Sequence, residues 1–334
     1  MSLAACSGSS SSAPSVFSAA SLQQALARVA DTDDTRSQIY YDDTSALVKL
    51  AGKSLDDTAG FAQLRGNGAT GLQPLAQTIA SQPGIELLAA DYTITAGSPP
   101  RQVGLLAGGQ PGSSITGNLT RVGWRQQGNT LVGPSPLAAG GDQQDTAILA
   151  LNLARVRANG ADLTYGQTSA NLDQIGSPSG RTLAQDPAVD AAAECLGDVV
   201  AAAIMAPYQG GRNPTVLAAG IRRPASNTDT PPAVVCVGWP DQDAASAYAT
   251  AVRQQLTSGL SITTNSRYNT LLRTPTVQNV GGDQHLVRWQ ADTPGDAQRV
   301  FTMIDSVDLP ALPNCTELGR LSAAARQQFG ATCP

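Results

Sequence analysis

The sequence has little of what catalysis and nucleic-acid binding usually require. It contains one histidine, His285, and its lysines are Lys49 and Lys53. Its 21 basic residues are outnumbered by 26 acidic ones, giving a net charge of −5, and the longest basic cluster is the pair Arg222-Arg223. Nucleic-acid binding needs a basic face, so we set it aside. For the same reason a polybasic patch that binds an anionic membrane surface is disfavoured. No segment approaches the roughly 18 consecutive apolar residues of a membrane-spanning helix.

Recognisable catalytic motifs are also missing. There is no G-x-S-x-G nucleophile elbow. His285 follows Asp283 in a predicted hairpin, where we expect the histidine simply to contact that neighbouring aspartate. Aromatic residues make up 4% of the chain, which leaves no evident stacking platform for sugars or bases. We expect Trp124, Trp239 and Trp289 to lie at core edges, with lining of a shared cleft as the alternative.

Two glycine-rich segments and one acidic segment partly match known ligand-binding motifs, but each is better explained by a structural role. Gly66–Gly71 matches G-x-G-x-x-G, but it follows a helix-like segment rather than the strand that dinucleotide binding requires. Gly108–Ser113 lies between a predicted strand and helix without a lysine, which favours a plain turn over an anion site. The aspartates within Asp31–Asp43 lack the glycine and distal glutamate of a calcium loop. We therefore predict loops and helix caps, with no cofactor and no metal.

The most specific motif lies at the amino terminus. Leu3-Ala4-Ala5-Cys6 is followed by the Ser/Gly/Pro-rich stretch Ser7–Ser15. This resembles the lipobox of bacterial envelope lipoproteins, and the scarcity of lysine beside abundant arginine and alanine is typical of an actinobacterial member. The resemblance implies export with a signal peptide, acylation of Cys6, and a location at the outer face of the cytoplasmic membrane. Residues 1–20 would then form a lipid-anchored flexible tether.

Four further cysteines are consistent with export. Cys195, Cys236, Cys315 and Cys333 allow three pairings. We favour Cys195–Cys236 together with Cys315–Cys333, because the second bridge would pin a tail, 311–334, that has few hydrophobic anchors. By loop entropy that tail bridge would contribute about 3 kcal/mol. Four buried thiols are the alternative, whereas zinc is disfavoured because no cysteine pair has the short spacing of a zinc site.

The hydrophobic pattern predicts an α+β protein. We expect hairpins around Asn159-Gly160 and around Gly281-Gly282-Asp283. Expected helices lie at 21–30, 44–51, 74–80, 115–122, 187–196, 244–256 and 300–307, and expected strands at 39–41, 86–95, 103–106, 199–205, 216–221, 234–237, 277–280 and 285–290.

The length of 334 residues exceeds what one core usually organises. The order of elements is similar in the two halves of the chain. We therefore expect two similar α/β lobes, 21–176 and 181–310, each a mostly antiparallel sheet with helices packed on one face.

These observations favour a non-enzymatic, lipid-anchored envelope protein that binds a partner or ligand. A carrier of a lipid or another apolar ligand is the alternative, and would need a large internal cavity. An envelope hydrolase is a third, weaker hypothesis, because the usual active-site elements cannot be assembled from the sequence.

Overall fold

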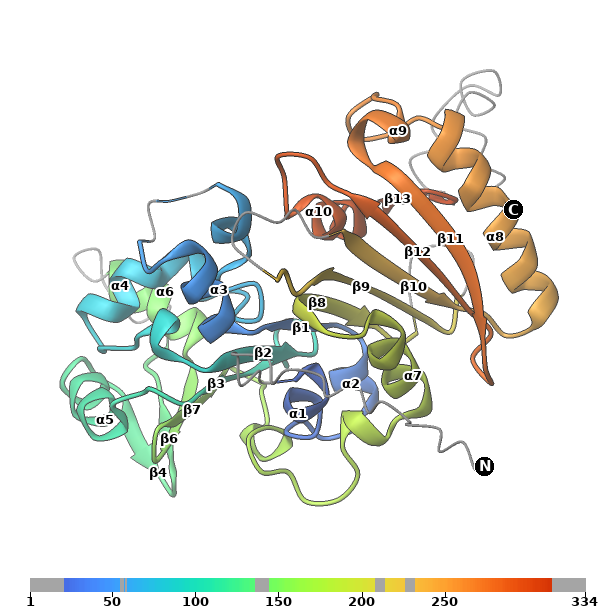
Figure 1. Ribbon diagram of the computed structural model, residues 1–334. Helices are drawn as coiled ribbons and strands as arrows, with labels where there is room; N and C mark the ends of the chain where they lie inside the picture. Colours follow the sequence, from blue (N-terminus) through green and yellow to red (C-terminus); the bar gives the residue numbers. More distant parts are fainter. Residues whose placement is uncertain are drawn as a thin grey trace, which may run out of the picture.

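A computed structural model describes residues 21–54, 57, 59–135, 144–207, 214–225 and 232–313. Within them, helices and strands build a mixed α and β fold around one antiparallel sheet of twelve strands (Figure 1). In spatial order the strands are β11 (Arg273–Gly281), β12 (Leu286–Asp292), β10 (Ala233–Gly238), β9 (Val216–Arg222), β8 (Val199–Met205), β1 (Ile39–Asp42), β2 (Tyr92–Ala96), β3 (Val103–Ala107), β7 (Asp162–Gly166), β6 (Arg155–Asn159), β5 (Thr130–Val132) and β4 (Arg125–Gln127). A separate pair joins β13 (Asp308–Leu309) to β14 (Leu312–Pro313).

The sheet is continuous because β1 joins its two halves. Tyr40 of β1 is in register with Thr95 of β2 on one side and with Ala203 of β8 on the other. The described strands thus form one large sheet rather than two, and the expected pair of similar lobes is not confirmed. The boundaries expected at 21–176 and 181–310 stay predictions.

Helices cover both faces of this sheet, whereas we expected one. The reason is that successive residues in the central strands are buried on both sides, so each face needs a cover. The helices are α1 (Leu22–Leu26), α2 (Asp33–Arg36), α3 (Thr44–Ala51), α4 (Ala76–Ser81), α5 (Gly112–Arg121), α6 (Gln144–Asn152), α7 (Pro187–Leu196), α8 (Gln242–Ser258), α9 (Tyr268–Leu271) and α10 (Arg299–Asp305).

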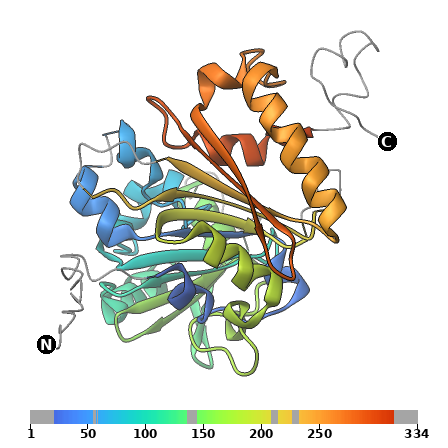
Figure 2. The same ribbon diagram turned by 45° about the vertical axis from the view of Figure 1, so that its right-hand side comes forward.

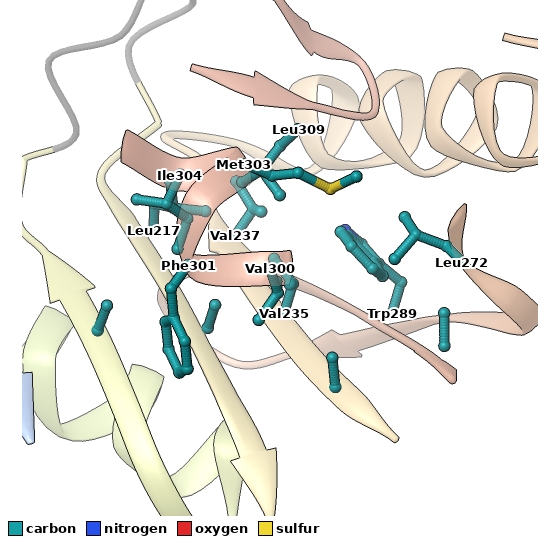
Figure 3. Close-up of a cluster of buried hydrophobic side chains, with 14 of the residues drawn as sticks. Leu217, Val235, Val237, Leu272, Trp289, Val300, Phe301, Met303, Ile304 and Leu309 are labelled. Carbon is teal, nitrogen blue, oxygen red and sulfur yellow. The ribbon is translucent and has the colours of Figure 1, made fainter. Parts of the chain in front are cut away.

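One face, here called the first face, carries two apolar clusters. Between them lies a polar strip formed by the buried residues Asp42, Thr93 and Thr95. Helices α3, α8, α9 and α10 cover the cluster around β8–β10 and β12, and α4, α5 and α6 cover that around β3 and β5–β7. In the first cluster Phe301 and Ile304 of α10 lie near Leu217 of β9 (Figure 3). One registered row on this face runs Trp289, Val235, Ala219, Ala203, Tyr40, Thr95, Gly104, Tyr165, Val156 and Leu131.

The opposite, second face has an apolar middle and basic ends. Helices α1 and α7 cover its middle, where Ile39, Ile204 and Ala218 belong to a single buried cluster. The registered row on this face runs Arg288, Cys236, Ala218, Ile204, Ile39, Ala96, Val103, Gly166 and Arg155. Arg288 therefore lies on β12 at one end of this row, beside Cys236.

Several local predictions are confirmed through their caps. Ser21 caps α1 with a capping box, and the Asp186 side chain accepts from two amides of α7, whose first residue is Pro187. The hairpin at Asn159-Gly160 forms, although its two-residue loop begins one residue later because Asn159 pairs with Asp162. Gly160 supplies the positive φ, 62°, that this turn needs.

Other local predictions are wrong. The strand expected over 86–95 begins only at Tyr92, because residues 87–89 form a turn of 3-10 helix. Helix α6 (Gln144–Asn152), which precedes the Asn159-Gly160 hairpin, was not expected. The short strands β4 and β5 were not expected. None of the helices in the described residues has the length and apolarity needed to cross a bilayer.

Candidate functional site

The main candidate site is a pocket of about 570 Å3 between α7 and the β11–β12 hairpin, here called the α7–hairpin pocket. The tip of that hairpin lies beside α7 in both orientations (Figures 1 and 2). The volume of the pocket lies within the roughly 300–1,000 Å3 typical of small-molecule sites. Helix α7 forms one wall, and the other is formed by strands β11 and β12 together with the turn that joins them.

Helix α7 supplies the acidic wall. Its residues Val189, Ala192 and Leu196 are buried against the sheet. Asp190 and Glu194 line the pocket from another side of the helix, and their spacing of four residues puts them on one face. Asp190 also accepts a hydrogen bond of 2.7 Å from the Gln23 side chain, which orients its carboxylate.

A disulfide fixes this wall to the sheet. Cys195 of α7 is bonded to Cys236 of β10, with a sulfur–sulfur distance of 2.02 Å, as the sequence favoured. With a sequence separation of 41, the bridge contributes about 4 kcal/mol by loop entropy. Cys236 is the register partner of Arg288, so the bridge lies beside the basic group of the pocket. Cys6, Cys315 and Cys333 lie outside the described residues, and the Cys315–Cys333 bridge stays a prediction.

The hairpin supplies one positive charge and one further negative charge. Arg288 lines the pocket from β12, and Asp283 lines it from the hairpin turn. Within the described part of the chain, the Arg288 side chain has no hydrogen bond or ion pair, and its Nε is buried without an acceptor. Burial, followed by the nearby charge of Arg222, lowers the pKa of the Arg288 guanidinium. A half-buried cation with no counter-ion gains more from binding an anion than one already paired.

A second polar pocket, of about 490 Å3, lies at the β6–β7 end of the sheet. Its two arginines are already neutralised. Arg28 is 2.7 Å from Asp162, and Arg157 is 3.0 Å from Asp173. A ligand there would have to displace an existing ion pair, so the α7–hairpin pocket is the better candidate.

The polar strip of the first face contains a fully buried carboxylate, Asp42. It accepts hydrogen bonds from the Thr44 hydroxyl at 2.6 Å, the Gly68 amide at 2.9 Å and the Thr93 hydroxyl at 2.9 Å. Desolvation raises the pKa of Asp42 to about 6, although these hydrogen bonds oppose the shift. Both carboxylate oxygens are engaged within the protein, which indicates that Asp42 organises the fold.

Gly66–Gly71, the glycine-rich segment with the dinucleotide-like pattern, packs on Asp42. The Thr95 hydroxyl donates to the Gly68 carbonyl at 2.6 Å. A Cβ at Gly68 would lie 2.3 Å from the Thr93 carbonyl oxygen, a distance that no side chain tolerates. Glycine is thus required because the loop approaches the sheet backbone directly, which explains this motif without a nucleotide.

The remaining sequence candidates have structural roles as well. The Gly108 amide of the second glycine-rich turn donates to Asp162 at 2.8 Å, so the protein itself supplies the anion. Asp31 pairs with Arg36 at 2.6 Å. His285 has a φ of 44° in the hairpin turn. Its expected contact with Asp283 is absent from the hydrogen bonds and ion pairs of the described residues.

The three tryptophans do not line a common cleft. Trp124 is buried in the cluster under α5, and its indole donates to the Leu153 carbonyl at 2.8 Å. Trp239 and Trp289 are buried in the other cluster of the first face. The alternative of a shared cleft is wrong, because the polar strip separates these two clusters.

Sequence reasoning missed the residues of the α7–hairpin pocket. Arg288 stands between Val287 and Trp289, both buried on the first face, so strand alternation could have placed its side chain on the second face. The pair Asp190 and Glu194 also has visible helical spacing. Their convergence with Arg288 depends on the packing of α7, which no local pattern reveals. Comparison of the chain with protein-family models, curated proteins and solved structures gave no match.

Proposed function

We propose that this protein is a non-enzymatic binding protein of the cell envelope, held at the outer face of the cytoplasmic membrane by a lipid on Cys6. It binds a partner or ligand of that compartment. The Cys195–Cys236 disulfide is the observation that carries this proposal. Structural disulfides form and persist in oxidising compartments and are rare in the cytoplasm of mesophiles.

The position of the disulfide supports a structural bond rather than a redox centre. Both cysteines are buried, Cys195 at 6% exposure and Cys236 at 0%. The bridge joins a helix to the sheet it covers, so it stabilises the second-face core. A catalytic disulfide needs an accessible sulfur for thiolate attack, which this burial opposes.

The charges of the α7–hairpin pocket favour a polar ligand over an apolar one. Arg288, Asp190 and Glu194 all line that pocket. Burying these groups against hydrocarbon would cost their hydration without replacing it. Binding of a charged ligand is therefore favoured over the alternative of lipid carriage.

Partition into detergent tests the anchor. The wild-type chain and Cys6→Ala, each expressed in actinobacterial cells, are separated by Triton X-114 phase partition, with Ser9→Ala as a tether control that keeps Cys6. The wild type and Ser9→Ala should enter the detergent phase, and Cys6→Ala the aqueous phase. Wild-type protein in the aqueous phase would refute lipid anchoring.

Native mass spectrometry of the same preparations tests the carrier alternative. A binding protein for a polar ligand should show its own mass, or that mass plus a hydrophilic adduct. A lipid adduct retained by Cys6→Ala, which has no anchor of its own, would instead favour lipid carriage.

A further inference from the structure

The charge pattern of the α7–hairpin pocket points to a class of ligand, an inference that rests on the proposed binding function. We propose that the pocket binds an amino acid with a second amino group, free or as the end of a short peptide. Its carboxylate would pair with Arg288, and its ammonium groups with the carboxylates of α7 and the hairpin turn.

The carboxylate end of the ligand follows from Arg288. Arg288 lines the pocket, and its side chain has no hydrogen bond or ion pair within the described residues. Arg222 adds a repulsive positive charge. A planar carboxylate can accept two parallel hydrogen bonds from a guanidinium, which is the geometry that arginine selects.

The ammonium end follows from the three carboxylates that line the pocket, two on α7 and one in the hairpin turn. Glu194 and Asp283 are exposed carboxylates at the pocket, and neither has a hydrogen-bond or ion-pair partner in the described part of the chain. Asp190 adds a third carboxylate, oriented by Gln23. These groups attract cations and repel a simple anion.

Charge counting then selects between ligand classes. The lining carries one guanidinium and three carboxylates. A simple diamine would leave Arg288 unpaired and would be repelled by it, and a fatty acid would meet the carboxylates. A molecule with one carboxylate and two ammonium groups complements both walls. The apolar surface of Val280 and Leu286, which also lines the pocket, suits the methylene stem that joins the charged ends.

Calorimetric titration at low salt tests this complementarity with three probes of similar length. L-lysine carries all the charged groups, cadaverine lacks the carboxylate, and hexanoate lacks both amino groups. Charged hydrogen bonds account for about 10- to 100-fold in affinity, so lysine should bind more tightly than either analogue by that factor. Equal binding of hexanoate and lysine, or no binding of lysine, would overturn the ligand class.

Variants assign the two ends of the ligand. Arg288→Gln should abolish the preference for lysine over cadaverine, because it weakens lysine binding and, by removing a repulsive positive charge, strengthens cadaverine binding. Arg125→Gln, on the exposed edge strand β4, is its matched control. Glu194→Gln should weaken lysine and cadaverine alike, by about two- to fivefold, as for a partly exposed ion pair. Asp243→Asn, on the exposed face of α8, is the control for that change.

The outcomes separate this inference from the proposed function. If Arg288→Gln weakens cadaverine as much as lysine, the assignment of Arg288 to the carboxylate is wrong. Glu194 is exposed, so its variant leaves the core intact and still tests the ammonium end if Arg288→Gln fails to fold. If lysine fails to bind but the protein still enters the detergent phase in a Cys6-dependent way, the ligand class is refuted and the proposed envelope location is unaffected.

Discussion

The buried carboxylate of Asp42 should make folding stability depend on pH in a way that one substitution removes. Its pKa rises from 3.8 to about 6 because burial disfavours the charged form. The native state therefore binds this proton more tightly than the unfolded state does. The stabilisation is complete below pH 3.8 and is lost as the pH rises through 6.

The full difference between the protonated and ionised limits is about 3 kcal/mol, at 1.36 kcal/mol for each pH unit. Between pH 5 and pH 8, the same two pKa values predict that the free energy of unfolding falls by about 1.4 kcal/mol. Asp42→Asn keeps the shape of the side chain and carries no titrating group. An amide can still accept from Gly68 and Thr93 and donate to Thr44, so we expect this variant to fold.

Urea unfolding, followed by fluorescence of the buried tryptophans, measures the effect. The free energy of unfolding of the wild type should fall by about 1.4 kcal/mol more than that of Asp42→Asn between pH 5 and pH 8. Asp243→Asn, an exposed carboxylate on α8, should retain the wild-type pH dependence. Identical pH dependence in the wild type and Asp42→Asn would refute the role assigned to this buried carboxylate.

Two further substitutions test how the halves of the sheet are held together. Gly68→Ala should lower the free energy of unfolding by about 1–3 kcal/mol through overpacking. Its control, Gly117→Ala, has open space at the added Cβ and should raise the free energy of unfolding by about 0.5–1 kcal/mol. Similar effects of the two substitutions would contradict the close contact between the loop and the sheet. Arg223→Gln breaks a 2.8 Å ion pair with the fully buried Asp43 and should cost about 3–5 kcal/mol in urea unfolding. Asp43→Asn combined with Arg223→Gln should recover part of that loss, and strictly additive losses would mean that the pair is not coupled.

Local features of the fold were predictable where neighbouring residues determine them. Ser21 and Asp186-Pro187 mark helix starts because their side chains or fixed φ satisfy the first turn of the helix itself. The strand expected over 199–205 is β8 with the same bounds, because a long apolar run favours a strand buried on both faces. Cysteine count and the expected compartment allowed three pairings, and Cys195–Cys236 was favoured among them because pairing Cys315 with Cys333 would pin the tail; the bridge between Cys195 and Cys236 is confirmed.

Long-range features were not predictable from these patterns. The pairing of Tyr40 with Ala203 joins segments more than 160 residues apart, and both strands would look the same in separate sheets. The candidate site has the same origin. Alternation can place Arg288 on the second face, but only the packing of α7 beside the hairpin creates the pocket that Arg288 lines.

Mapping the cysteines in protein taken directly from cells tests the proposed envelope location most directly. Free thiols are blocked by alkylation in intact cells before lysis, and the protein is digested without reductant for mass spectrometry. The proposal predicts a linked peptide pair containing Cys195 and Cys236, separated only after reduction. Alkylated Cys195 and Cys236 in freshly lysed cells would contradict an oxidising environment and, with it, the proposed location.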